Sequence, residues 1–162
     1  MKKLVVLAAL ALALMGCATQ PELPAFQPAK SQSALIRWQR RDVSLTSEGV
    51  FAQASNGGVL MRLYKQSPAP LLELRLEPNG LLSAKGSLAG PGWSGQVGNA
   101  PPPLAIWAAL LNIYQTAATL PDGTKEIQTA EARLSYVKNQ SGFASLSIVS
   151  TDRPETVTVL FR

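Results

Sequence analysis

The residue types that could do chemistry are few in this chain of 162 residues, and histidine is not among them. Histidine is the commonest general base near neutral pH and the commonest metal ligand. Its absence, together with a single cysteine at position 17, excludes every zinc site that needs Cys/His spacing. No Gly-x-Ser-x-Gly nucleophile elbow, Walker loop or dinucleotide fingerprint occurs. We therefore predict no metal site, no cofactor and no catalytic residue.

Two pairs of carboxylates come close together in the sequence, but neither pair requires a catalytic role. Glu73 and Glu77 share one face of an expected strand with Arg75 between them, so ion pairing accounts for both. Asp122 precedes Glu126 by four residues and lies in a Pro-Asp-Gly sequence that is typical of a turn. We therefore predict that the protein is not an enzyme.

The N-terminus carries the pattern of an export signal. Lys2 and Lys3 precede an uncharged apolar run from Leu4 to Met15, and the small residue Gly16 stands just before Cys17. The run is shorter than the roughly 20 apolar residues that a transmembrane helix needs. It therefore predicts export rather than a membrane span.

The four residues Leu14-Met15-Gly16-Cys17 resemble the lipobox of bacterial lipoproteins. The resemblance implies that residues 1–16 are a signal peptide and that acyl chains such as palmitate are attached to Cys17. Two or more acyl chains hold a protein stably on a membrane, whereas one chain does so only marginally. Ala18 stands where an aspartate would favour retention at the inner membrane. The resemblance thus implies a lipid anchor in the outer membrane, facing the periplasm, with the membrane as a partner through acylated Cys17.

The charge balance argues against nucleic acid as a partner. The chain has 15 Lys and Arg residues against 10 Asp and Glu residues. The basic residues are scattered rather than clustered, as a nucleic-acid surface would require. Arg37, Arg40 and Arg41 lie beside Trp38, where they could bind lipid headgroups or an acidic partner, or form a solvated strand face.

The composition changes after the anchor. Residues 17–33 contain Pro21, Pro24 and Pro28 and predict an extended, semi-rigid tether, unless Phe26 packs part of it on the domain. Residues 34–162 are long enough for one domain with its own hydrophobic core.

Most of this domain shows the alternation of apolar and polar residues that is typical of β-strands. A strand is expected from Leu35 that continues through Phe51, and Asn56-Gly57 predicts a hairpin. The cleanest alternation places Leu72, Leu74 and Leu76 on one face. Further expected strands and turns follow at residues 59–65, 82–84, 127–129, 132–137, 143–151 and 156–161.

One segment has helical spacing. Leu104 to Thr119 follows three prolines and contains no charged residue, so most of its circumference should be covered. We predict an α+β fold in which an antiparallel, strongly curved sheet, an incomplete barrel, wraps around one main apolar helix.

This order of elements resembles the LolA/LolB-type lipoprotein carrier fold. The resemblance consists of the lipobox ending at Cys17, the hairpins through Leu82, the proline-led helix containing Trp107, and the closing strands ending at Phe161. It implies a protein that binds or carries an apolar ligand such as a lipid or the acyl chains of a lipoprotein.

Two functions follow from these patterns. The first is an apolar-ligand site, for which ordinary core packing is the other interpretation of the same side chains. Its expected lining residues are Leu72, Leu74, Leu76, Trp107 and Leu111. The alternative is a non-catalytic envelope protein that docks a protein partner or supports an assembly.

Overall fold

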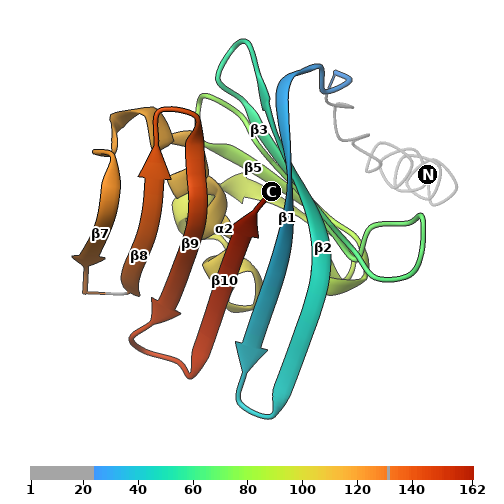
Figure 1. Ribbon diagram of the computed structural model, residues 1–162. Helices are drawn as coiled ribbons and strands as arrows, with labels where there is room; N and C mark the ends of the chain where they lie inside the picture. Colours follow the sequence, from blue (N-terminus) through green and yellow to red (C-terminus); the bar gives the residue numbers. More distant parts are fainter. Residues whose placement is uncertain (1–23, 131) are drawn as a thin grey trace, which may run out of the picture.

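The protein is built on one antiparallel sheet of ten strands, in the order β6-β5-β4-β3-β2-β1-β10-β9-β8-β7 (Figure 1). The computed structural model describes residues 24–130 and 132–162. Strands β6 and β7 lie at the two ends of the order, so the sheet is open. The strands are β1 (Pro28–Arg40), β2 (Val43–Ala54), β3 (Val59–Tyr64), β4 (Leu72–Leu76), β5 (Leu81–Lys85), β6 (Trp93–Gln96), β7 (Gly123–Gln128), β8 (Ala132–Asn139), β9 (Gly142–Ser150) and β10 (Glu155–Phe161).

The predicted α+β fold with an incomplete barrel is wrong. The protein is mostly β, with an open sheet and a single α-helix, α2 (Pro102–Gln115), in the described part of the chain. The reason lies in the last strand. β10 pairs with β1, so the meander after the helix extends the sheet beyond β1. Closing the sheet would require the two end strands, β7 and β6, to pair with each other as well, and they do not.

The predicted strand through Phe51 is also wrong, because the chain reverses at Arg41 and Asp42. Arg41 has a φ of 49°, and Arg40 pairs directly with Val43. Two long strands, β1 and β2, therefore replace one. A non-glycine residue at positive φ is uncommon, so no residue at this position predicted a turn.

Two tight turns contain a glycine at positive φ, and the first of them confirms the predicted hairpin at Asn56-Gly57. At Asn56-Gly57 the Gly57 φ is 87°, and its N–H donates to the Ala54 carbonyl at 3.0 Å. At Pro78-Asn79-Gly80 the Gly80 φ is 82°. Glycine adopts this left-handed region without the steric cost of a Cβ, which explains both positions.

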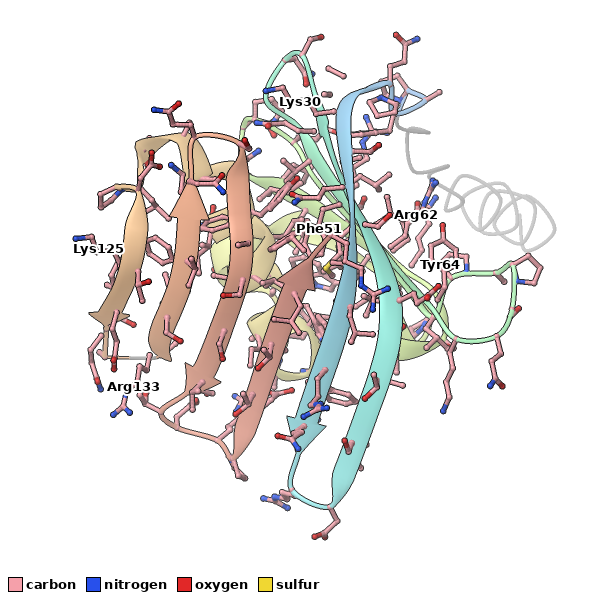
Figure 2. The ribbon with its side chains drawn as sticks, in the orientation of Figure 1. Lys30, Phe51, Arg62, Tyr64, Lys125 and Arg133 are labelled. Atoms are coloured by element: carbon pink, nitrogen blue, oxygen red, sulfur yellow. The ribbon has the colours of Figure 1, made fainter. Side chains whose placement is uncertain are left out.

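Helix α2 packs against one face of the sheet and touches strands from both halves, namely β3, β4, β9 and β10 (Figure 1). Pro102 and Pro103 occupy its first turn, where their missing N–H groups cost nothing. The helix ends at Gln115, earlier than Thr119, and a separate 3₁₀ turn, η4 (Ala117–Thr119), follows. Figure 2 shows Phe51 between sheet and helix, whereas Lys125 and Arg133 project from the β7–β8 edge.

The folded part begins before Ala34. Residues 28–33 of the expected tether belong to β1 and pair with β2. Ahead of them, the Arg75 guanidinium lies 5.6 Å from the Phe26 ring centroid and donates to the Pro24 carbonyl. Residues 24–27 therefore pack on the sheet, while the expected signal and Cys17 lie outside the described residues.

Candidate functional site: a cavity where β10 ends

The five residues expected to line an apolar-ligand site lie in the packed core. Leu72, Leu74, Leu76, Trp107 and Leu111 are each 0–1% exposed and belong to one cluster between α2 and the sheet. The structure thus brings all five together, but none of them lines the cavities described below. Their burial supports the interpretation of ordinary packing.

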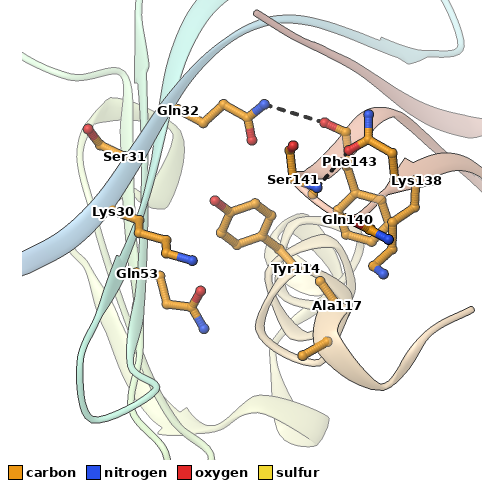
Figure 3. A pocket seen from close by; sticks show the side chains of 13 residues that line it. Lys30, Ser31, Gln32, Gln53, Tyr114, Ala117, Lys138, Gln140, Ser141 and Phe143 are labelled. Carbon is orange, nitrogen blue, oxygen red and sulfur yellow. Dashed lines mark hydrogen bonds between the residues drawn. The ribbon is translucent and has the colours of Figure 1, made fainter. Parts of the chain in front are cut away.

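A cavity of about 430 Å³ lies where β10 ends. The pairing of β10 with β1 stops at Ala34 opposite Phe161, and its pairing with β9 stops at Ser145. Beyond this point β1 and β9 continue without a strand between them. The Gln32 side-chain amide crosses the gap and donates to the Phe143 carbonyl at 3.4 Å (Figure 3). The missing length of strand explains why a hollow forms at this place.

The cavity combines an aromatic floor with a polar rim. Tyr114, from the last turn of α2, points its phenol into the opening between β1–β2 and the β8–β9 hairpin (Figure 3). Lys30 and Gln53, which pair directly across β1 and β2, lie on one side. The remaining lining residues are Ser31, Gln32, Ala117, Ala118, Lys138, Asn139, Gln140, Ser141, Gly142 and Phe143.

The floor is rigid because Tyr114 belongs to an aromatic cluster. Its ring centroid lies 4.9 Å from that of Phe51, 5.8 Å from that of Phe161 and 6.5 Å from that of Phe143. Burial raises the pKa of Tyr114 above its usual value, so the phenol is neutral at physiological pH. None of the described residues hydrogen-bonds its hydroxyl, which leaves that group available to a ligand.

The cavity carries positive charge. In the described chain no carboxylate lies within 4 Å of the Lys30 ammonium, whereas Lys138 pairs with Asp122 at 2.6 Å. The Lys138 side chain is 11% exposed, and its charge lies at the rim. An uncompensated ammonium beside hydroxyl and amide groups suits an anionic ligand.

The other residues considered for chemistry form ordinary contacts. Glu73 pairs with Arg62 at 2.7 Å, Glu77 pairs with Arg75, and Glu126 pairs with Arg133 at 3.4 Å. Ion pairing therefore accounts for these carboxylates.

The expected patch around Trp38 is divided between the two faces of the sheet. Arg37 is exposed on the outer face, whereas Trp38 packs against the core and donates from its indole Nε1 to Glu155 at 2.8 Å. Arg40 lies on the same side as Trp38, and Arg41 lies in the turn. The structure does not bring the three arginines and Trp38 into one surface.

No sequence pattern predicted the cavity, because its two sides are far apart in the chain. Lys30 and Gln32 lie within the expected tether, and residues 139–142 lie between two expected strands. Tyr114 lies within the expected helix, from Leu104 to Thr119. No local signal unites them, since their proximity depends on the point at which β10 stops.

Comparison with known proteins adds no assignment: no family model matches the chain, and no curated protein matches its sequence. Within residues 24–162, residue 131 aside, no helix is long and apolar enough to cross a membrane. The same residues contain no group of three or more Asp, Glu, His or Cys side chains that could hold a metal ion.

Proposed function

We propose that the protein binds an acyl-chain amphiphile with an anionic head group in the cavity where β10 ends. The observation that carries this proposal is the Lys30 ammonium, which has no carboxylate partner in the described part of the chain, beside the floor formed by Tyr114 and Phe143. The cavity volume of about 430 Å³ lies within the range of about 300–1,000 Å³ that is typical of small-molecule sites.

The arrangement of the lining suggests how such a ligand lies. Its head group meets Lys30 and the amides of Gln53 and Gln140, and its chain contacts the rings of Tyr114 and Phe143. The ligand therefore occupies the end of the sheet, and the packed leucine core takes no part. In this proposal the acylated Cys17 holds the domain at the periplasmic face of the outer membrane, within reach of lipids.

The test uses the full chain with Cys17→Ser, which removes its single thiol and excludes an attached acyl chain as a competing ligand. Monododecyl phosphate, below its micelle concentration, is titrated against the protein by calorimetry, with dodecanol as the neutral counterpart. We expect saturable binding of the phosphate that Lys30→Gln weakens about fivefold, or about 1 kcal/mol.

The matched control is Lys125→Gln, which removes an exposed lysine of β7 that lies outside the cavity. We expect the control to bind monododecyl phosphate like the parent protein. Absence of saturable binding, or equal losses in the two lysine variants, would contradict the proposal.

One observation favours docking as a second function. All residues of the edge strand β7 are exposed, and only β8 pairs with it. An extended segment of a partner could add to this edge through main-chain hydrogen bonds. If docking is the function, Ile127→Pro should abolish co-purification of an envelope partner while leaving monododecyl phosphate binding intact.

A further inference from the structure

The most deeply buried carboxylate of the described chain is Glu155, at the start of β10. The residue is 3% exposed, and one carboxylate oxygen, Oε1, accepts a hydrogen bond from Trp38 Nε1 at 2.8 Å. Trp38 in turn packs against Trp107 of α2, with ring centroids 5.9 Å apart. The side chain of Glu155 is therefore held in one orientation by a donor that is itself fixed in the core.

The other carboxylate oxygen of Glu155 has no partner among the described residues. Among the described residues, the side-chain polar atoms that are sealed from solvent and make no hydrogen bond are Arg75 Nε and Glu77 Oε1, which form an ion pair with each other. Glu155 Oε2 is not one of them, so it is not sealed from solvent. Glu155 lines a cavity of about 220 Å³. The walls of this cavity are formed largely by small or apolar side chains, namely Ala105, Ile106, Ala109, Ala132 and Ile148.

No cation of the described chain lies within 4 Å of the Glu155 carboxylate. Arg153 and Asp152 also line this cavity, but the Arg153 guanidinium is held by other groups: its Nη1 donates to the Pro102 carbonyl at 3.1 Å, and its Nε lies 3.5 Å from Asp152 Oδ2. Burying a carboxylate without a positive partner is costly. A cation bound beside Glu155 would therefore stabilise its buried carboxylate.

We propose that this second cavity binds a primary alkylammonium group carried on a short alkyl stem. An ammonium has three donors and no acceptor, which suits the free oxygen of Glu155 together with the hydroxyl of Ser150 at the rim. The apolar walls of α2, Ala105 and Ala109, suit the alkyl stem. A metal ion would instead require several oxygen ligands converging on one point.

The proposal does not depend on the function proposed for the first cavity. The two cavities share no lining residue and lie beside opposite ends of α2. An amine and an anionic amphiphile can therefore be tested separately, and the failure of one leaves the other standing.

The test titrates n-butylammonium into the ¹⁵N-labelled full chain with Cys17→Ser, with n-butanol as the neutral probe of the same length. We expect saturable shifts of the amides around Ala109 and Glu155 with the amine. The near-isosteric Glu155→Gln should weaken binding at least about tenfold, or about 1.4 kcal/mol. Equal binding of butanol and butylammonium, an unaffected Glu155→Gln variant, or no saturable binding would overturn the proposal.

A second variant tests the cavity without changing its charge. Ala105 is exposed at the cavity wall, so Ala105→Leu should fill the space while the fold is retained. Asn112→Leu, at an exposed position of the same helix outside the cavity, is the matched control. We expect loss of butylammonium binding in Ala105→Leu alone. Retained binding in Ala105→Leu, or equal loss in both variants, would overturn the placement of the stem.

Discussion

The two cavities lie beside opposite ends of the same strand and the same helix, yet they carry opposite charge. The larger, basic cavity forms where β10 ends at Phe161 and contains Lys30 and Lys138. The smaller, acidic cavity forms where β10 begins at Glu155. The comparison shows that these two hollows lie at the ends of one strand, outside the packed cluster between helix and sheet.

The helix favours this distribution of charge. Helix α2 contains no charged residue of its own, so its macrodipole places partial positive charge at the N-terminus and partial negative charge at the C-terminus. Ala105, Ile106 and Ala109 of α2 line the acidic cavity, and Tyr114 of the last turn lines the basic one. Each cavity thus has the sign of charge that the nearer end of the helix stabilises.

The largest expected effect comes from truncating a core side chain of α2, the helix that contributes residues to both cavities. Trp107→Ala deletes a core side chain that is 1% exposed, and such truncations cost about 3–5 kcal/mol. We expect a large loss of unfolding free energy in urea and the loss of both binding activities. The exposed Asn112→Ala should change the unfolding free energy by no more than about 0.5 kcal/mol. Similar stabilities of the two variants would contradict the role of the shared helix.

A smaller loss of unfolding free energy is expected from a change at the acidic cavity that leaves binding in the basic cavity intact. Trp38→Phe removes the donor to Glu155 and leaves a buried carboxylate oxygen unsatisfied, at a cost of about 1–3 kcal/mol. Urea unfolding should show this loss, while monododecyl phosphate still binds in the basic cavity. Trp93→Phe is the control, since the Trp93 indole makes no hydrogen bond to a described residue. If the two variants lose equal stability, the hydrogen bond to Glu155 contributes nothing.

A change at the rim should raise affinity in the basic cavity alone. Asp122→Asn breaks the partly exposed pair with Lys138, at a cost to stability below about 1 kcal/mol. Because the Lys138 ammonium is then free, we expect calorimetry to show about twofold tighter binding of monododecyl phosphate. Glu126→Gln breaks the exposed pair with Arg133 outside the cavity and should not change affinity. Weaker phosphate binding in Asp122→Asn would count against a role for Lys138.

The smallest effect appears only in alkali. Burial raises the pKa of Tyr114 in the folded state, so folding favours the neutral phenol. This contribution is fully present below the unfolded pKa of about 10 and is lost as the pH rises through the folded pKa. Urea unfolding from pH 9 to about 11 should therefore show a smaller fall in stability for Tyr114→Phe than for the parent protein. Parallel pH profiles of the two proteins would show that folding does not change the pKa of Tyr114.

Local patterns correctly predicted much of the fold. The alternation of Leu72, Leu74 and Leu76 predicted β4, and Asn56-Gly57 predicted the β2–β3 turn. The reversal at Arg41 could not be predicted in this way, because it lacks a glycine and interrupts an otherwise continuous strand pattern. The candidate sites were not predictable either, because their residues are far apart in the sequence. Lys30 and Tyr114 line the same cavity, and Trp38 donates a hydrogen bond to Glu155.

The sequence by itself determined four features: an N-terminus that resembles an export signal, the absence of histidine, strands with alternating apolar and polar residues, and one uncharged helix. These depend on residue type and short spacing, which act locally. Only the tertiary structure decided that β10 pairs with β1, that the sheet stays open, and that cavities of opposite charge form at the two ends of β10. Strand order and strand ends depend on pairing between distant segments, which no local pattern specifies.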